Sequence, residues 1–524
     1  MIETLILIYN TIRLLLAIST DSQFDASQSA DPGTMAHLPS AITHPCDHLT
    51  GDYKTWLSRA VNVDVVVIGG GVAGLSALNT LFTHGVKDIL LLEAQDRLGG
   101  RVHTIRQDGV LVEEGAEWIH GGEQNSLYRL ATKLDAVDTN LPDDAWDHRF
   151  VTQDGGLVDS EVYELAELLM NKCKENGMLV PFYNTSYGQY YIDRIQEAYR
   201  PGNNTASGKA LLHYLEHMVN YEEGTGSWQD ISARDADQFI DYGDDHQWQD
   251  GFDTLISQLT VGIPDSTMKL SSPVCKIFWD TPDQARVLVV TLKGDTFLAQ
   301  HVIVTASIGH IRERHKHIFS PELPASLVTA FMAVHLGVAN KVQVGWDEPW
   351  WGTDPLDLHI IWTTFDLPLD MSWLYGEVNI YSIHRHPGVL QLFVTGANSI
   401  HVENLPEDII KKHVLYLLKR VTGENISQPT FFWRSRWSSN PWTRGSYSSY
   451  ITVSGAKAGI HHRDQLAVPL TNSKGQAVVV WAGEHTHNTR YGTVDGAMDT
   501  GKREALRIVS LIKSSSSLLP AVEN

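Results

Sequence analysis

Residues 65–78 read VVVIGGGVAGLSAL, a run of branched apolar residues followed by closely spaced glycines. The run Val65 to Ile68 is typical of a strand buried in a parallel sheet. The segment Ala73 to Thr83 has leucines at helical spacing, and Gly85 can end that helix. The stretch therefore predicts a strand, a tight turn and a helix, which is the arrangement that binds a dinucleotide.

The glycines of this turn have separate expected roles. Gly69 permits the sharp bend, Gly71 lets the backbone approach a pyrophosphate, and Gly74 allows the helix to pack closely on the strand. A second apolar run, Ile89 to Leu92, leads to Glu93, 24 residues after Gly69 and near the spacing of an acid that binds ribose hydroxyls. A glycine-rich turn of another α/β protein stays an alternative, and the motif alone leaves NAD and FAD both open.

Two further motifs carry a resemblance to a known family. The stretch EAQDRLGGRVHT, Glu93 to Thr104, is similar to the second motif of the flavin-containing amine oxidases. The stretch VVVWAGEHTHNTRYGTVDGAMDTGKREA, Val478 to Ala505, is similar to the carboxy-terminal flavin motif of the same family. The resemblance implies FAD as the cofactor. Beside Gly69, Gly71 and Gly74, it assigns FAD contacts to Glu93, Arg101, Val274, Glu484 and Val494.

The resemblance also implies the fold. It is α/β, with α+β character overall, and consists of a discontinuous Rossmann-like FAD-binding domain with an inserted substrate domain of mixed sheet plus helices. Strand-like runs at 286–292, 301–305 and 477–482 can complete the nucleotide-binding sheet. The expected divisions are a disordered leader at 1–60, the FAD-binding domain at 61–135, 251–318 and 429–515, a helical cap of the substrate domain at 136–250, its second part at 319–428, and a tail at 516–524.

An amine oxidase moves a hydride equivalent from the carbon beside an amine nitrogen, and its protein supplies position, a neutral amine and a dry pocket. Residues 432–450, FWRSRWSSNPWTRGSYSSY, resemble the family's aromatic-cage segment. Tyr447 falls on one cage wall and Thr493 on the other, so the cage is expected to be half open to a long polyamine. A core tyrosine is the alternative for Tyr447. The other rings of this segment are Trp433, Trp437 and Trp442.

Two more residues complete the expected site. Lys341, in VANKVQVGW, occupies what looks like the position of the family lysine that reaches the flavin through a water, although a lysine on an alternating strand is often only solvated. The stretch EEGAEWIHGG at 113–122 is similar to animal polyamine oxidases in particular. That resemblance places His120 at the mouth of the substrate tunnel, with Glu117 as a second contact to a cationic nitrogen.

Differences from the family also carry information. Ser446 stands where monoamine oxidases carry the cysteine bonded to the flavin, and no cysteine follows Cys275. We therefore expect non-covalent FAD. Two departures lie near the expected flavin: Ala306-Ser307-Ile308 where Val-Pro-Leu is usual, and Asp495 where polyamine oxidases often have histidine. They bear on rate and substrate more than on fold.

Composition limits the partners. The chain has 524 residues, a net charge of −22 and no dense Lys/Arg run, so nucleic acid is not an expected partner. An acidic surface attracts cationic substrates, although solubility explains it equally well. Cys46, Cys173 and Cys275 are too few and too scattered for a disulfide framework or a zinc site, and we expect buried or idle thiols. His485 and His487 form no metal-ligand motif, so we expect no metal.

The amino-terminal stretch is a poor targeting signal. Residues 5–18 are mostly apolar, but polar residues interrupt them, no basic region precedes them, and they are too short to span a membrane. We expect a cytoplasmic protein with no membrane association and no obligate protein partner. Secretion is the alternative, in which case the sequons at Asn184, Asn203 and Asn425 matter.

The leading interpretation is an FAD-dependent polyamine oxidase. It would oxidise spermine, spermidine or N1-acetylated forms with O2, releasing an aldehyde, a shorter amine and H2O2. A monoamine or L-amino-acid oxidase on the same fold is the nearest alternative; Ser446 argues against the former, and no arginine clamp for the latter is identified. A flavin-binding protein that has lost catalysis is a further alternative.

Overall fold

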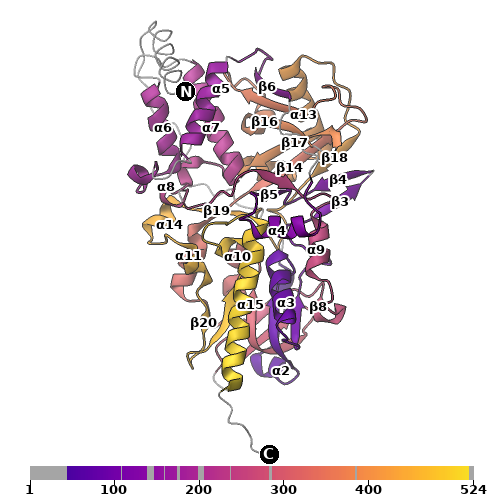
Figure 1. Ribbon diagram of the computed structural model, residues 1–524, viewed down its shortest axis with the longest axis vertical. Coiled ribbons are helices and arrows are strands. Elements are labelled where there is room, and N and C mark those ends of the chain that lie inside the picture. Colours follow the sequence, from indigo (N-terminus) through magenta and orange to yellow (C-terminus); the bar gives the residue numbers. More distant parts are fainter. Residues whose placement is uncertain are drawn as a thin grey trace, which may run out of the picture.

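The computed structural model of the chain describes residues 44–517, apart from residues 108, 139–146, 159, 174–177, 199–205, 237, 282–285 and 384–385. Two lobes are stacked along the long axis of the molecule (Figure 1). The lower lobe is built on a nine-stranded sheet and the upper lobe on a six-stranded sheet. The α/β class expected from the sequence is therefore confirmed.

The nine-stranded sheet is organised around the glycine-rich stretch. Strand β1 (Val61–Ile68) pairs in parallel with β11 (Thr296–Val304) on one side and β2 (Ile89–Leu92) on the other. These strands are largely apolar because helices cover both faces of the sheet. The other strands are β8 (Met268–Lys269), β9 (Val274–Phe278), β10 (Val287–Thr291), β12 (Phe319–Ser320), β20 (Leu470–Thr471) and β21 (Ala477–Trp481).

Helices from distant parts of the chain cover this sheet. On one face α3 (Val72–Thr83) packs against α15 (Val494–Ser517), so the two glycine-containing flavin motifs become neighbours. Residues of α4 (Ser126–Lys133) and α9 (Asp253–Leu259) belong to the same apolar cluster. The cluster on the other face includes residues of α10 (Ile308–Ile318), α11 (Ala325–Ala333) and α14 (Val453–Lys457).

The six-stranded sheet has the strand order β18-β14-β17-β16-β15-β6. Only β6 and β15 pair in parallel; the other neighbours are antiparallel. Its strands are β6 (Asp147–Thr152), β14 (Ala339–Gly345), β15 (Leu356–Ile361), β16 (Asn379–Ile383), β17 (His386–Thr395) and β18 (Phe431–Arg434). The helices of this lobe include α5 (Ser160–Cys173), α6 (Tyr187–Ala198), α7 (Ala206–Glu223), α12 (Gly396–Asn404) and α13 (Glu407–Thr422).

The two faces of the six-stranded sheet differ in character. Val342 and Leu392 on one face belong to an apolar cluster that also contains residues of α13. The opposite face is polar, and helix α7 lies against it through hydroxyl contacts to His359 and Tyr381. This polar face is turned towards the junction of the lobes.

Short paired strands lie near that junction. One pair is a local hairpin, and the other two join segments that are more than 100 residues apart in the sequence. The pairs are β3 (Thr104–Gln107) with β4 (Val110–Glu113), β5 (Trp118–His120) with β7 (Asp245–Gln247), and β13 (Val334–Leu336) with β19 (Ser448–Ile451).

The segment before the nine-stranded sheet is ordered, which corrects two expectations. Residues 44–60 contain η1 (Pro45–His48) and α2 (Tyr53–Leu57), and Trp56 packs in a cluster with residues of β10 and β11. A disordered leader is therefore wrong for residues 44–60; residues 1–43 lie outside the described residues.

The expectation of free thiols is also wrong for two of the three cysteines. Cys46 forms a disulfide with Cys275 of β9, 229 residues away, with a Cα–Cα distance of 5.4 Å. Scattered positions in the sequence did not exclude a bond, because folding brings η1 beside β9. The side chain of Cys173 lies outside the described residues. In the part of the chain that is described, no helix has both the length and the apolar character required to cross a bilayer.

Candidate active site

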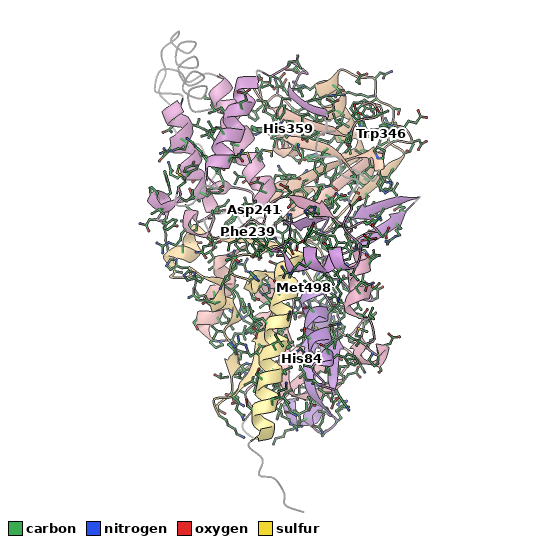
Figure 2. The ribbon with its side chains drawn as sticks, viewed as in Figure 1. His84, Phe239, Asp241, Trp346, His359 and Met498 are labelled. Carbon is green, nitrogen blue, oxygen red and sulfur yellow. A yellow bond between two sulfur atoms is a disulfide. The ribbon has the colours of Figure 1, made fainter. Side chains whose placement is uncertain are left out.

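A cavity of about 1440 Å³ lies between the two lobes. Phe239 and Asp241, which line it, are found at the level where the lobes meet, and His359 lies in the upper lobe (Figure 2). The lining extends from Gly69 in the turn after β1 to Lys341 on the polar sheet face. The cavity thus joins the nucleotide-binding turn to the six-stranded sheet.

The glycine turn has the geometry that its residues predict. Gly69 has a positive φ of 107°, which a side chain would strain. A Cβ on Gly74 would lie 1.9 Å from the Gly69 carbonyl oxygen, so helix α3 can approach β1 only with glycine at that position. Gly71 lines the cavity at the N-cap of α3, where N–H groups of the first helical turn lack intrahelical acceptors. These groups form a site for an anion.

Glu93 follows β2 and lines the same end of the cavity. Its buried carboxylate accepts hydrogen bonds from the backbone N–H groups of Gly70 at 2.5 Å and Gln95 at 2.7 Å. Burial raises the pKa of this carboxyl, and the two backbone hydrogen bonds oppose that effect. The remaining lone pairs can accept from ribose hydroxyls.

Arg101 and Glu484 form an ion pair that connects distant segments. The Arg101 guanidinium donates to Glu484 Oε1 at 2.8 Å and to the Ser446 carbonyl at 2.5 Å. Glu484 also accepts from the Ser448 hydroxyl and from the backbone N–H of Gly492. Burial alone would raise the pKa of Glu484, but Arg101 and the Ser448 hydrogen bond outweigh it and lower the pKa. The carboxylate therefore stays ionised and holds the cavity wall together.

The other predicted cofactor residues also line this cavity. Val274 is buried on β9, directly before the disulfide-bonded Cys275, and Val494 begins α15. Ser446 is buried, and its hydroxyl accepts from the Ala339 N–H at 3.1 Å.

Tyr447 and Thr493 both line the cavity, as the resemblance predicts for the two cage walls. Burial raises the pKa of Tyr447, so its hydroxyl stays protonated. The Thr493 hydroxyl accepts from the Gly496 N–H at 3.1 Å and so caps helix α15. Trp437 and Trp442 line the cavity, whereas Trp433 packs on an apolar cluster at the edge of the sheet.

Lys341 is buried on β14 and is not a solvated strand residue. Its ammonium group donates to Glu117 Oε2 at 2.7 Å and to the Glu113 carbonyl at 2.9 Å. Gln391 on β17 and Gln247 on β7 donate to the same Glu117 carboxylate. Glu117 is therefore an ion-pair partner of Lys341, and its contact with a cationic substrate nitrogen stays a prediction.

His120 lines the cavity at the end of β5 and is partly exposed. Its Nδ1 lies 3.0 Å from both carboxylate oxygens of Asp245 on the paired strand β7. Arg490 donates to the His120 carbonyl and forms a buried bidentate pair with Asp495. Asp495, a departure from the family pattern, thus has a structural partner that positions β5.

Several cavity residues were missed from the sequence. Those on the strands alternate along the chain, so they point to the same side of the six-stranded sheet, and the others lie on the helix that packs against that side. The sequence does show polar residues at every second position within buried strands. A single strand, however, does not show which other strands contribute to the same polar face. These residues are Tyr381 and Asn379 on β16, Phe393 on β17, Asp357 and His359 on β15, and Tyr221, Glu222 and Glu223 at the end of α7.

The described residues fit FAD. The anion site at the start of α3 suits the pyrophosphate, Glu93 suits the ribose, and the apolar Val274 suits the adenine side. The wall made by Arg101, Ser446 and Glu484 bounds the same cavity nearer the polar sheet.

Comparison with known proteins identifies the family of the chain. Residues 72–509 match the family model described as flavin containing amine oxidoreductase. The chain is 30% identical to the peroxisomal N(1)-acetyl-spermine/spermidine oxidase of Bos taurus, covering 85% of this chain and 94% of that protein, and 30% identical to the Homo sapiens protein of the same name, covering 85% and 95%. A solved wild-type putrescine oxidase bound to putrescine has a TM-score of 0.66 at 19% identity, covering 86% of this chain and 100% of that one. The chain therefore belongs to the flavin-containing amine oxidoreductase family and is an FAD-dependent amine oxidase.

Proposed function

We propose that this enzyme oxidises polyamines, in the class of spermine, spermidine and their N1-acetylated forms, with O2 as the second substrate. The observation that carries the proposal is the cavity between the lobes, which combines several carboxylates with aromatic rings along an extended polar sheet face. A thin polycation has alternating charged and apolar segments, and such a lining complements both. The acids that line the cavity include Glu222, Glu223, Asp241, Asp245 and Asp357, and the rings include Tyr221, Phe239, Tyr381, Phe393 and Tyr447.

We further propose non-covalent FAD, held by Gly69, Gly71, Gly74, Glu93, Arg101, Val274, Glu484 and Val494. FAD held there would supply the two-electron redox chemistry between the amine and O2. Ser446 offers a hydroxyl where a thiol would be needed for a bond to the flavin, and that hydroxyl already accepts from Ala339.

The chain's own residues would prepare the amine for oxidation. Tyr447 and Thr493 would flank the reacting carbon, and the neutral Tyr447 ring supplies an electron-rich surface without a charge. Lys341, fixed by Glu117, would present an ammonium group beside the reacting centre and stabilise negative charge that develops when O2 is reduced. His120, oriented by Asp245, would contact an outlying nitrogen of the substrate.

The cavity favours amines over amino acids. An L-amino-acid oxidase needs a cation for the substrate carboxylate, and Arg101 is the one arginine among the described residues that line the cavity. That guanidinium is already engaged by Glu484 and the Ser446 carbonyl. Lys341 is likewise engaged by Glu117. The surplus of carboxylates therefore supports a cationic substrate.

The test is peroxide release by the purified yellow enzyme offered spermine, N1-acetylspermine, benzylamine and L-leucine. We expect the two polyamines to give peroxide at kcat/KM values at least tenfold above those for benzylamine and L-leucine. Preference for benzylamine or L-leucine would contradict the proposal. A yellow protein whose flavin is not reduced anaerobically by any of the four amines would identify a flavin-binding protein without oxidase activity.

The disulfide changes the proposal on location. A stable bond between Cys46 and Cys275 requires an oxidising compartment, so we propose the secreted alternative in place of a cytoplasmic protein. The sequons at Asn184 and Asn425 are exposed, as glycosylation requires, while Asn203 lies outside the described residues. The full chain expressed in animal cells should lose mass when it is treated with an N-glycosidase, and Asn184→Gln should lose less than wild type. If the treatment leaves the mass of both proteins unchanged, the cytoplasmic alternative is favoured.

A further inference from the structure

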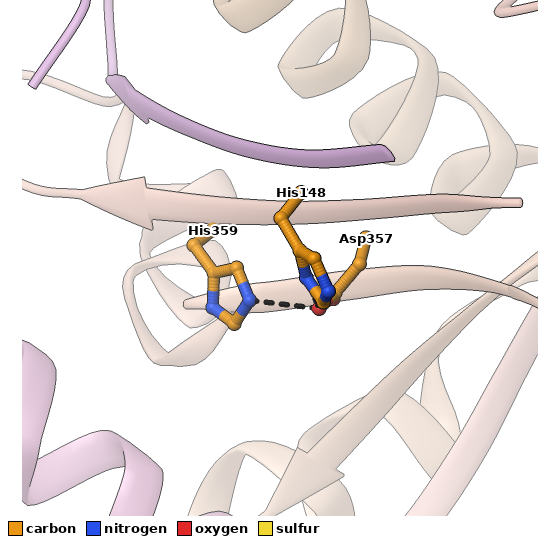
Figure 3. A group of neighbouring side chains, drawn as sticks. All are labelled: His148, Asp357 and His359. Carbon is orange, nitrogen blue, oxygen red and sulfur yellow. Dashed lines mark hydrogen bonds and ion pairs between the residues drawn. The ribbon is translucent and has the colours of Figure 1, made fainter. Parts of the chain in front are cut away.

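Three side chains on the polar face of the six-stranded sheet converge near its outer edge. Asp357 and His359 lie two residues apart on β15, so both point to the same face. His148 on β6 is the register partner of Asp357 in the parallel pair. Figure 3 shows the three side chains directed towards one another. The sequence could not indicate this cluster, because His148 and Asp357 are 209 residues apart.

The facing atoms form a compact donor set. Asp357 Oδ2 lies 2.7 Å from His148 Nδ1 and 2.9 Å from His359 Nε2. One ligand atom from each of the three residues lies within 4.8 Å of the others. Two imidazoles and one carboxylate are a ligand set that binds zinc and related divalent transition metals.

The surroundings orient two of these ligands, His359 and Asp357, as a metal site requires. The Tyr214 hydroxyl lies 2.9 Å from His359 Nδ1, so in the tautomer with a proton on Nδ1 the ring donates to Tyr214 and Nε2 keeps its lone pair. Asn379 donates to the other carboxylate oxygen of Asp357 at 2.5 Å. Phe150 stacks on the His359 ring at 4.3 Å and fixes its plane. Ligands held by outer partners in this way lose little freedom when a metal binds.

The cluster is also accessible. All three residues line the cavity, and 55% of the His148 side chain is exposed. A cation therefore has a path from solvent and room to keep one or more waters.

We propose that His148, Asp357 and His359 form a site for a divalent transition-metal cation of the zinc class, with an open coordination position towards the cavity. Binding replaces the two histidine–Asp357 hydrogen bonds by three metal–ligand bonds, with the histidine protons moving to Nε2 of His148 and Nδ1 of His359. The proposal departs from the expectation, drawn from the sequence motifs, that the protein has no metal site.

The test is calorimetric titration of the flavin-loaded enzyme with ZnCl2, supported by the visible spectrum of CoCl2-treated enzyme. We expect one zinc per chain and intense cobalt bands typical of four or five ligands. His148→Ala with His359→Ala should weaken zinc binding at least 100-fold. Asp357→Asn keeps an oxygen that can accept the hydrogen bond from Asn379 but removes the negative charge, and it should weaken zinc binding at least tenfold. The matched control is His84→Ala, an exposed histidine in the other lobe (Figure 2), which should leave zinc affinity unchanged.

Thermal unfolding of each variant shows whether it is folded before titration. Absence of zinc binding in the wild type, or equal affinity in wild type and the double variant, would overturn the proposal. A secondary consequence rests on the proposed function: a dication in the cavity should inhibit oxidation of spermine more than oxidation of benzylamine. Failure of the peroxide test leaves the calorimetric result interpretable, and failure of zinc binding leaves the peroxide test unaffected.

Discussion

The two large sheets of this protein are stabilised in different ways. In the nine-stranded sheet Val65, Val66 and Val67 of β1 are fully buried, and apolar clusters cover both faces. In the six-stranded sheet the buried strand β14 alternates, with Val342 on the apolar face and Lys341 on the polar one. Close packing is decisive in the first sheet, whereas the second must satisfy buried charges by specific partners.

The difference explains how one chain can provide both a binding site for FAD and a cavity for an amine. A rigid apolar sheet fixes the position of the glycine turn, so that its backbone N–H groups can contact the dinucleotide. A sheet with a polar face can line a cavity with groups that bind a charged molecule. Each of these groups needs a hydrogen-bond or ion-pair partner within the protein when that molecule is absent. Four changes test this comparison.

The largest effect is expected for Gly74→Ala in the nine-stranded sheet lobe. The new Cβ would lie 1.9 Å from the Gly69 carbonyl oxygen, which Thr305 holds by a hydrogen bond. We expect loss of bound flavin and destabilisation of more than about 4 kcal/mol. Flavin absorbance of the purified variant and its thermal unfolding provide the measurement. Gly122→Ala is the control, since a Cβ there meets nothing within 4 Å; equal colour in both variants would contradict the packing argument.

Lys341→Met tests the polar sheet. Removal of the ammonium group leaves Glu117 as a buried carboxylate without its ion-pair partner, which should cost about 3–5 kcal/mol of unfolding free energy. It should also slow reoxidation of the bound flavin, measured by stopped-flow spectroscopy. Lys341→Met with Glu117→Gln should recover most of the stability but none of the reoxidation rate. Reoxidation as fast as in wild type would show that Lys341 is only structural.

Loss of the disulfide should have an intermediate effect on the stability of the lower lobe, which contains the nine-stranded sheet. Cys46→Ser with Cys275→Ser removes a cross-link between segments 229 residues apart and should lower the free energy of unfolding by about 2–4 kcal/mol. Because Val274, next to Cys275, lines the cavity, flavin affinity should fall as well. Denaturant unfolding with and without reductant is the measurement. Cys173→Ser serves as the control; if reductant affects the double variant as strongly as wild type, the assigned pairing is wrong.

The smallest effect concerns a buried carboxyl in the upper lobe and its dependence on pH. Burial raises the pKa of Glu377 to about 8, while the unfolded chain titrates near 4.5. Between these values the unfolded state binds fewer protons than the folded state, so this group lowers stability as pH rises. Relative to Glu377→Gln, wild type should lose about 2–3 kcal/mol between pH 5 and pH 7 at 1.36 kcal/mol per unit.

Unfolding curves at the two pH values check this prediction. For Glu484→Gln, the change in stability relative to wild type should have the opposite sign. The pKa of Glu484 is lowered, so its contribution is present at neutral pH and is lost only on acidification. Glu484→Gln should therefore be destabilising at pH 7, while Glu377→Gln is stabilising. A pH-independent difference between wild type and Glu377→Gln would show that the carboxyl titrates normally.

Much of the lower lobe, with its nine-stranded sheet, could be predicted from local sequence. The apolar run at Val65, the glycines after it and the leucines of the following helix are contiguous, so each element was evident within about 20 residues. The position of Lys341 on an alternating strand was also predicted, together with its place in the site. Its partner was not, because Glu117 lies 224 residues earlier, directly before the separate strand β5. The same limit explains the missed Cys46–Cys275 bond.

The sequence by itself determined the strand–turn–helix that receives a dinucleotide, the family and the chemistry of an amine oxidase, because these depend on short motifs whose geometry is set by neighbours along the chain. Only the tertiary structure decided which buried polar groups are paired. Strand pairing places His148 beside Asp357, and contact between the lobes places Lys341 beside Glu117, each at hydrogen-bonding distance. Charges act over a few ångströms in space, and the spacing of residues in the sequence does not specify that distance.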